Sequence, residues 1–345
     1  MASSTPEFEE VCDGLSFPEG GPIYLRDGSV ILVEIRAGLL VRVFPDGRSK
    51  VALADLGGGP NSSAVGPDGA IYITQSGGLG PYAEGWTHGA IQRVDPVSGE
   101  VSTLYTSGAA IDGSGQVGLQ APNDLVFDAH GGFYFTDLGK EYTRTADVTG
   151  IFYAQIDGSA CTEVILKGGW PAGIGGPLNK PNGIALSPDG TKLYACETPT
   201  GRLWSWDVIG PGQLKQLIVT SVTRGTTTSA PEATLVYASP DSYGFDSMAV
   251  DGDGNICVAT LGDGSLGAGG ITVVRPDGSR HSFLTFGDTF TTNIAFGGAD
   301  GRDAYITLSG SGRLVKMRWH CAGHRCHYED LLDPARVIGG GSPKL

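Results

Sequence analysis

One stretch decides the fold: Gly183-Ile-Ala-Leu-Ser-Pro-Asp-Gly-Thr-Lys-Leu-Tyr-Ala-Cys196. It holds two short apolar runs separated by the tight-turn sequence Pro188-Asp-Gly190. Short apolar runs joined by a turn of this kind predict a β-hairpin. A third run, Arg202–Trp206, begins directly after Gly201. The pattern therefore predicts a meandering antiparallel sheet.

The same pattern recurs six times along the chain. Its turns lie at Asp27-Gly28, Pro67-Asp68-Gly69, His130-Gly131-Gly132, Pro188-Asp189-Gly190, Asp253-Gly254 and Gly301-Arg302. A fourth run follows five of the units, at Lys50–Ala54, Val101–Tyr105, Thr162–Leu166, Leu214–Ile218 and Arg280–Phe286. Six four-stranded units of about 45–60 residues predict an all-β fold, a six-bladed β-propeller around a central channel. Two β-sandwiches, the competing fold, would not repeat one turn-strand pattern six times.

We expect a single propeller domain over residues 1–345. Its blades are expected near 17–56, 61–106, 122–167, 182–219, 245–287 and 293–319. The sixth unit lacks a fourth run of its own. The N-terminal segment 8–12 is expected to supply that strand through Glu9–Cys12, which would close the ring and cover an exposed edge.

Composition agrees with a turn-rich β protein. Glycine accounts for 56 of 345 residues, well above the usual level of about 7%. Without a Gly-X-Y period this is not collagen, and glycine disfavours long helices. The net charge of −14 argues against a nucleic-acid partner. The sequence shows neither a signal peptide nor an apolar run that would span a membrane, so we expect a soluble, cytoplasmic protein without a membrane partner.

One residue precedes the first strand of every unit, and all six are oxygen donors. These residues, called the ring residues below, are Glu19, Asn61, Asn123, Asn182, Asp246 and Asn293. First strands line a propeller's channel, so the six side chains should surround its axis on the face that carries the longer loops. Two carboxylates with amide oxygens suit Ca²⁺, with Zn²⁺, Mn²⁺ or Mg²⁺ as substitutes. The alternative is that each residue only caps a turn. Six oxygen donors at one register favour a metal site.

At these residues the sequence resembles the senescence-marker-protein/gluconolactonase/luciferin-regenerating family of six-bladed propellers. The matching segments are Phe17–Pro22, Pro122–Asp124, Lys180–Gly190, Phe245–Asp251, Thr292–Gly298 and Ala304–Gly310. The resemblance implies a divalent metal ion at the centre of the channel, held by Glu19, Asn123, Asn182 and Asp246. It also implies a hydrolase that opens lactone rings or, as in some relatives, hydrolyses organophosphate esters.

Two positions depart from the family pattern. Ala121 stands where sugar-lactone relatives often carry an arginine, and Ser247 stands where the fifth blade usually has glycine. The first departure favours a bulkier or less polar lactone over a simple aldonolactone. Two further alternatives stay open: a non-catalytic, metal-binding scaffold propeller and a propeller similar to strictosidine synthase.

The expected mechanism places Asp246 beside the cation as general base or as direct nucleophile, because ester hydrolysis needs both a polarised carbonyl and an attacking oxygen. Glu19 is expected to act as a ligand alone. Asn61 and Asn293 would orient substrate or water, and Asp124 would support the ligands from behind. From the long loops, candidates for contact with substrate are Trp86, His88, Tyr142 and Tyr243, which would otherwise pack within their loops.

Other motifs say less about function. Gly262–Gly267 matches a dinucleotide-binding pattern, but a strand follows it instead of a helix. The cluster His320-Cys-Ala-Gly-His-Arg-Cys-His327 has three readings: a structural metal site, a Cys321–Cys326 disulfide, or a polar tail. The other four cysteines lie singly and are expected to be buried and reduced.

Overall fold

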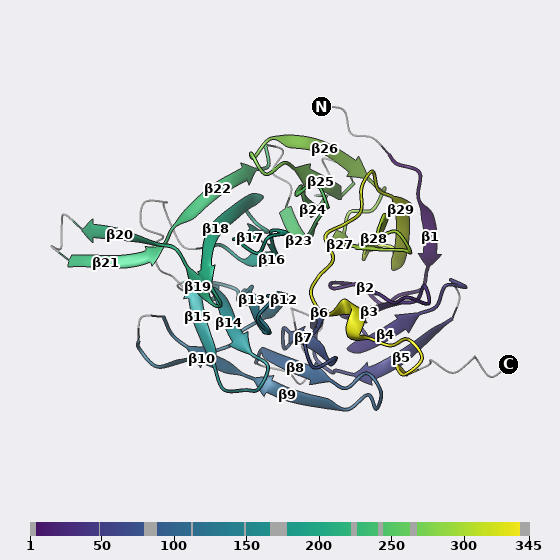
Figure 1. Cartoon of the computed structure of the whole chain (residues 1–345), viewed down its shortest axis with the longest axis horizontal. Helices are drawn as coiled ribbons and strands as arrows, with labels where there is room; N and C mark the ends of the chain where they lie inside the picture. The colour runs from purple at the N-terminus through teal and green to yellow at the C-terminus, as the bar shows by residue number, and fades with distance from the viewer. Residues whose placement is uncertain are drawn as a thin grey trace.

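A computed structural model of the chain describes residues 5–47, 49–78, 88–111, 113–147, 150–165, 178–221, 226–240, 244–262 and 268–338. Figure 1 shows six small sheets that follow one another in chain order around a central axis. Among the described residues the one helical element is the short 3-10 helix η2 (Glu329–Leu331). None of these segments forms a helix with the length and hydropathy of a membrane span. The all-β, six-bladed propeller is confirmed.

Each blade is an antiparallel sheet whose innermost strand lies at the channel. From the channel outward, blade 1 consists of β2 (Ile23–Tyr24), β3 (Val30–Glu34), β4 (Leu39–Val43) and β5 (Lys50–Asp55), and blade 2 of β6 (Pro60–Val65), β7 (Ile71–Gln75), β8 (Ala90–Val94) and β9 (Val101–Tyr105). In the same order, blade 3 consists of β12 (Pro122–Phe127), β13 (Gly132–Asp137), β14 (Gly150–Gln155) and β15 (Cys161–Ile165), and blade 4 of β16 (Pro181–Leu186), β17 (Lys192–Glu197), β18 (Arg202–Gly210) and β22 (Ala233–Ala238). Blade 5 consists of β23 (Gly244–Val250), β24 (Ile256–Leu261), β25 (Gly270–Val274) and β26 (Arg280–Thr285), and blade 6 of β27 (Thr291–Gly297), β28 (Asp303–Leu308), β29 (Arg313–Arg318) and β1 (Glu9–Cys12).

The N-terminal strand β1 is the outer strand of blade 6. It pairs antiparallel with β29, and the register places Glu9 opposite Lys316 and Cys12 opposite Leu314. The two ends of the propeller are therefore joined within one sheet, so that neither β1 nor β29 is left as an unpaired edge on that side.

Blade 4 differs from the sequence prediction. Its outer strand is β22, and the predicted fourth strand at Leu214–Ile218 is wrong. The chain instead turns back at the end of β18 into β19 (Gln213–Leu214). It then forms the hairpin β20 (Gln216–Ser221) and β21 (Thr226–Pro231), a two-stranded sheet of its own within the described part of the chain. Because β19 covers just the last residues of β18, the rest of that edge stays available to β22.

Blade 3 also carries an addition. The connection between blades 2 and 3 contains the short strands β10 (Ser107–Ala109) and β11 (Gln116–Gly118). β10 pairs parallel with β15 and extends that sheet outward.

The repeated turns explain why the blades form where the sequence predicts. The Asp189 carboxylate accepts a hydrogen bond from the Thr191 amide at 3.0 Å, and Gly190 has φ of 69°. Asp27 and Gly28 repeat this arrangement, with φ of 87° at the glycine. An aspartate that bonds the backbone two residues on, followed by a residue in the left-handed region, fixes a tight turn between strands.

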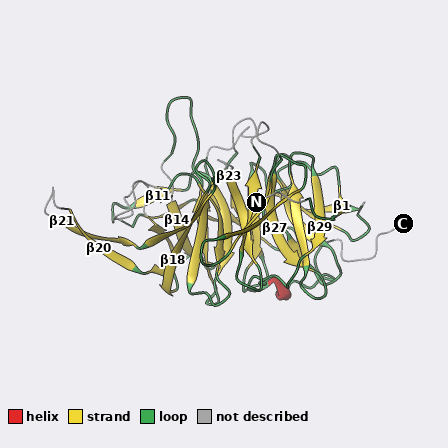
Figure 2. Cartoon of the chain, turned by 90° about the horizontal axis from the view of Figure 1, so that it is seen from above, coloured by secondary structure: helices red, strands yellow, loops and turns green. Residues whose placement is uncertain are grey.

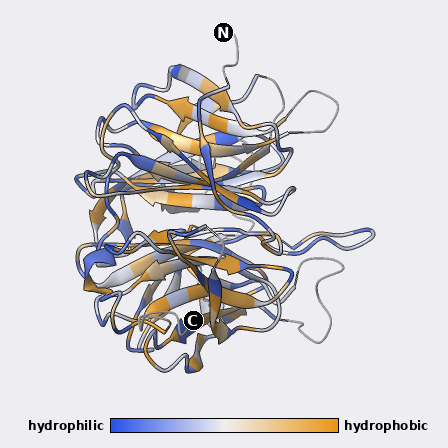
Figure 3. Cartoon of the chain, turned by 90° about the vertical axis from the view of Figure 1, so that its right-hand side faces the viewer, coloured by the Kyte–Doolittle hydropathy of each residue, from blue (hydrophilic) through white to orange (hydrophobic). Residues whose placement is uncertain are grey.

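The hydrophobic core lies between neighbouring blades. Figure 3 shows the apolar colour following the strands, with much of the hydrophilic colour on the loops. At the contact between blades 4 and 5, for example, Leu203 packs with Phe245 and Val258, and all three side chains are fully buried. Burial of alternate strand residues on both faces of each sheet is what holds successive blades together.

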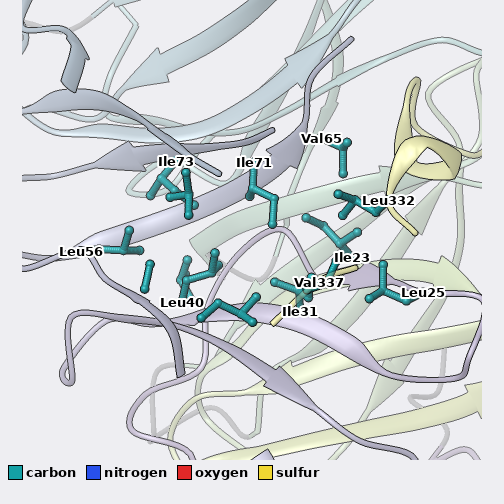
Figure 4. Close-up of a cluster of buried hydrophobic side chains, with 14 residues drawn as sticks. Ile23, Leu25, Ile31, Leu40, Leu56, Val65, Ile71, Ile73, Leu332 and Val337 are labelled. Atoms are coloured by element: carbon teal, nitrogen blue, oxygen red, sulfur yellow. The ribbon is translucent and has the colours of Figure 1, made fainter. Parts of the chain in front are cut away.

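The last described part of the chain, Trp319–Ile338, is called the C-terminal segment below. It crosses the face of the disc next to the channel (Figure 1), and η2 lies on one face in the side view of Figure 2. Its residues Leu332 and Val337 enter the core between blades 1 and 2 beside Ile23 (Figure 4).

All six cysteines are free. Four are buried, as expected, and they are Cys12, Cys161, Cys196 and Cys257. Cys321 and Cys326 in the C-terminal segment form no disulfide, which removes one of the three readings of that cluster.

Candidate metal centre

The innermost strands form a closed ring around the channel. Each contacts the innermost strand of the next blade, in the order β2, β6, β12, β16, β23, β27 and back to β2. Five of the ring residues are the second or third residue of their innermost strand, and Glu19 lies four residues before β2. All six side chains are buried, with exposed fractions between 3% and 6%. Oxygen-bearing side chains from six separate parts of the sequence thus share one end of the channel.

Backbone irregularities mark this position. In five blades the strand register shifts next to the ring residue, as between Pro122 and Leu125 in blade 3 and between Phe245 and Met248 in blade 5. A β-bulge bends its strand and re-aims a side chain. Five bulges at one register are consistent with a ring of residues around the channel axis.

Three of the ring asparagines present an amide oxygen without a partner. Among the described residues, the Oδ1 atoms of Asn61, Asn123 and Asn182 are buried and accept no hydrogen bond. The Asn182 amide is oriented by its Nδ2, which donates to Thr198 Oγ1 at 3.0 Å. Asn293 differs, since its Oδ1 accepts the Ile294 amide at 2.7 Å. Buried oxygens are rarely left without a partner, so the three orphaned oxygens point to a cation.

Three carboxyl groups add negative charge to the same place. Burial raises the pKa of Glu19 well above its usual range, and the charges of Asp246 and Asp124 raise it further. Burial likewise raises the pKa of Asp246 to about 8 and that of Asp124 to about 6. Carboxyl groups crowded together in this way hold protons unless a cation compensates their charge. Two ring carboxylates with orphaned amide oxygens fit a hard divalent cation.

Asp124 lies directly behind the ring. Its Oδ1 accepts hydrogen bonds from Ser62 Oγ at 2.7 Å and from the Leu125 amide at 2.9 Å, and its Oδ2 accepts the Ile184 amide at 3.3 Å. These contacts join the innermost strands of blades 2, 3 and 4. Asp124 is thus a structural link between blades next to the ring.

Two further sets of residues hold the ring residues in place, and the sequence analysis did not identify them. The first set accepts backbone N–H groups from the segments leading into ring residues: Glu34 from Ser16 (2.7 Å), Gln75 from Gly59 (2.6 Å), Asp137 from Gln120 and Ala121 (2.8 Å each) and Glu197 from Asn179 (2.8 Å). The second set donates to the ring residues' own carbonyl oxygens: Thr74 to Asn123 (2.5 Å), Thr136 to Asn182 (2.6 Å) and Cys196 to Asp246 (2.8 Å). The signal was the adjacent polar pairs at positions 74–75, 136–137 and 196–197, which end the second strands of successive units.

Behind the ring, a cavity of about 90 Å³ continues along the channel. All six innermost strands line it, and Asp124 and Asn293 stand at its ring end. Its floor is the C-terminal segment, through His324, Cys326, His327 and Glu329. The C-terminal segment therefore covers the channel at the end opposite the ring.

Comparison with known proteins identifies the fold family. The family model described as "SMP-30/Gluconolactonase/LRE-like region" matches residues 17–310. The chain belongs to this family. A gluconolactonase of Zymomonas mobilis is 26% identical over 338 residues, which cover 91% of this chain and 82% of that protein. The lactonase drp35 of Staphylococcus epidermidis is 27% identical over 242 residues, but that match spans only 62% of its length.

Solved structures share the propeller architecture. A calcium-binding regucalcin of Agrobacterium tumefaciens superposes with a TM-score of 0.65 at 17% sequence identity, covering 94% of this chain and 97% of that one. At this level of identity the match shows the common fold.

The predicted substrate-contact residues are distributed unevenly. Trp86 and Tyr243 lie outside the described residues. His88 is exposed, and Tyr142 is 55% exposed with its hydroxyl 3.4 Å from Asp147 of the same loop. Neither of these two lines the channel cavity. Ala121, which departs from the arginine of the family pattern, is buried, and its amide donates to the Asp137 carboxylate.

Proposed function

We propose that this chain is a divalent-metal-dependent hydrolase that opens a lactone ring. The cation would be held by Glu19, Asn123, Asn182 and Asp246. The single observation that carries the proposal is the group of orphaned amide oxygens, buried beside two carboxylates at one end of the channel. The names of two relatives, a gluconolactonase and a lactonase, support the reaction class.

The chemistry divides between the cation and the protein. A divalent cation bound at this position supplies polarisation of the ester carbonyl and a lower pKa for a neighbouring water. Asp246 accepts a proton from the attacking water and returns it to the ring oxygen when the carbon–oxygen bond of the lactone breaks, which yields a hydroxy acid. Glu19 contributes charge, and Asn61 and Asn293 orient the water and the substrate.

The donor set favours Ca²⁺ as the native cation. Every side chain in the ring offers oxygen alone, which is the ligand type that Ca²⁺ prefers, whereas Zn²⁺ favours nitrogen and sulfur. Ala121 supports a bulkier or less polar lactone over an aldonolactone, because alanine has no positively charged group to bind a sugar acid.

A lactone panel tests the proposal. The full chain would be assayed on an aldonolactone, on alkyl-substituted lactones and on an organophosphate ester, before and after chelation and after Ca²⁺ is added back. We expect turnover of the alkyl-substituted lactones that is lost with the cation and restored by it. A chain that binds Ca²⁺ yet turns over none of these esters would instead be a metal-dependent binding protein.

A further inference from the structure

The face of the disc opposite the ring holds a second group of metal-ligating side chains. The C-terminal segment passes here against the turn that follows β23, and it is joined to that turn by backbone hydrogen bonds. The Gly252 amide donates to the Ala322 carbonyl at 2.7 Å, and the His324 amide donates to the Val250 carbonyl at 2.9 Å. This pairing brings His320 and Cys321 next to Asp251 and Asp253, almost seventy residues earlier in the sequence.

The ligand atoms of this group lie close to the His320 ring. His320 Nε2 lies 3.6 Å from Asp251 Oδ2, 3.3 Å from Asp253 Oδ2 and 3.5 Å from Cys321 Sγ. The ligand atoms of Asp251, His320 and Cys321 all lie within 4.8 Å of one another. Around a tetrahedral zinc ion, with bonds of about 2.0–2.3 Å, neighbouring ligand atoms are separated by roughly 3.3–3.7 Å. The distances from His320 fall in that range.

The central carboxylate is also held as a ligand would be. Asp251 is fully buried, and its two oxygens accept hydrogen bonds from Asn255 Nδ2 at 3.1 and 2.9 Å. Trp319 Nε1 donates to the same Oδ2 at 3.2 Å. Ligating carboxylates are commonly fixed by outer hydrogen bonds of this kind. Asp253 is exposed, so its side chain has room to adjust.

We propose that Asp251, His320 and Cys321, with Asp253 as the fourth ligand, bind a zinc ion that fastens the C-terminal segment to blade 5. One sulfur, one nitrogen and carboxylate oxygens form a set that selects Zn²⁺ over Ca²⁺. Binding replaces the Cys321 S–H bond with a sulfur–zinc bond and releases the proton to solvent. The chain then carries two cation sites of different chemistry at opposite ends of the channel.

The other half of the sequence cluster does not take part. His324, Cys326 and His327 line the channel cavity instead, so the eight-residue run is divided between two surroundings. The cation at Asp251 would also be separate from the ring. Asp246 lies near the start of β23 and Asp251 directly follows its end. Five residues at about 3.3 Å each separate them by roughly 16 Å.

Cobalt titration tests this site, because a Co²⁺–thiolate bond gives a charge-transfer absorption that oxygen ligands do not. The full chain, stripped of metal and kept in excess Ca²⁺ so that the ring is occupied, should show this band at one Co²⁺ per chain. Cys321→Ser should abolish it, and Cys326→Ser, the matched control in the same segment, should keep it. Added Zn²⁺ should displace the Co²⁺ and raise the melting temperature of the parent but not of Cys321→Ser.

Further variants guard against misfolding. Circular dichroism would establish that Cys321→Ser is folded, and His320→Ala provides a second route to the same result. Either variant should weaken zinc binding by more than the 10–100-fold that loss of an outer hydrogen-bond partner costs. A parent chain without the band, a band that Cys321→Ser retains, or one that Cys326→Ser removes would overturn the proposal.

Discussion

Asp246 combines two roles that one substitution separates. Asparagine at this position keeps an oxygen for the cation but is too weak a base to take a proton from water. We therefore expect Asp246→Asn to lower kcat by about 10²–10⁴-fold, the usual contribution of a general base, while calcium binding persists. Rate measurements on a reactive lactone and calorimetric titration with Ca²⁺ provide the two readouts.

Glu19→Gln is the matched comparison for Asp246→Asn. Like Asp246→Asn it removes one ligand charge, so it should weaken calcium binding by a similar amount, but it leaves the base in place and should recover activity at high Ca²⁺. Hydrolysis by Asp246→Asn at the parent rate would show that another group takes the proton. Incorporation of solvent ¹⁸O into the Asp246 carboxylate during turnover would reveal direct nucleophilic attack by this residue.

The raised pKa values of the ring carboxyls predict how stability depends on pH. The pKa of Asp246 rises from 3.8 to about 8 on folding, and that of Asp124 rises from 3.8 to about 6. Without a cation the folded chain holds these protons more tightly than the unfolded chain does. The resulting stability is fully present below the unfolded pKa of 3.8 and is lost progressively as the pH rises to the folded values, about 6 for Asp124 and about 8 for Asp246.

We accordingly expect the melting temperature of the metal-free chain to fall as the pH is raised across this interval. The calcium-loaded chain should not show this fall, because the cation binds the ionised carboxylates. Thermal denaturation at a series of pH values, in chelator and in excess Ca²⁺, checks the expectation. Asp246→Asn should flatten the metal-free curve, and parallel curves in the two conditions would argue against a cation among these carboxyls.

At the scale of the elements, the sequence predicts strands better than it predicts their partners. The Pro-Asp-Gly turns fix which runs form hairpins, because a tight turn leaves the chain no other neighbour. The outer strand of blade 4 has no such turn. Leu214–Ile218 has the composition of a strand, yet β18 pairs with β22 after an inserted hairpin. Strand composition says which residues extend, and the partner depends on contacts between distant segments.

The ring residues show the same limit: the sequence reveals a residue's type but not its distant partner. The six oxygen donors were visible because each occupies one register of a repeat. The residues that hold them were not, because Thr136 and Cys196 act across a blade boundary, on carbonyls about fifty residues away. Such a contact appears only when two repeats are placed side by side. Threonine and cysteine in an apolar strand otherwise resemble ordinary core residues.

The inserted hairpin of β20 and β21 is expected to be dispensable. Its ends are already joined, because the Glu232 amide donates to the Lys215 carbonyl at 2.8 Å and the two side chains form an ion pair at 2.9 Å. Figure 1 shows the hairpin projecting away from the disc. Replacing residues 216–231 with a two-residue turn should leave β22 in place, because the closing pair remains.

Lactonase rate and melting temperature measure the effect of that deletion, and both should stay close to the parent values. Removal of β22 itself, residues 233–238, is the contrasting variant, and it should destabilise blade 4 by exposing the edge of β18. A hairpin deletion that is as damaging as the loss of β22 would show that β20 and β21 support the propeller.

At the scale of the whole molecule, the C-terminal segment links blades that are not neighbours in sequence. It is bonded to blade 5 through Gly252, and the Ile338 amide donates to the Pro96 carbonyl of blade 2 at 3.0 Å. The propeller is thus closed twice, by β1 within blade 6 and by this segment across one face. The sequence did not predict the second closure, because the segment has no strand periodicity and its partners are spread over the chain.

Arg42 is the main anchor of this second closure. Its guanidinium is fully buried and donates to the carbonyls of Pro334, Val337 and Ile338 at 3.1, 3.2 and 3.3 Å, and it pairs with Asp27 at 2.5 Å. Arg42→Met keeps much of the apolar volume but removes every donor. Because several buried bonds are lost together, we expect unfolding to become easier by about 2–4 kcal/mol. Chemical denaturation measures this change.

The anchor also predicts where the variant opens first. Limited proteolysis should cut Arg42→Met within the C-terminal segment well before the blades, because the segment loses three backbone attachments while the strands of blade 1 stay paired with one another. Arg26→Met is the matched control. Arg26 pairs with Asp330 of the same segment at 3.2 Å, but both side chains are exposed, and an exposed pair contributes little. Equal stability and equal cleavage of the two variants would mean that the core contacts of Leu332 and Val337, without Arg42, hold the segment across the disc.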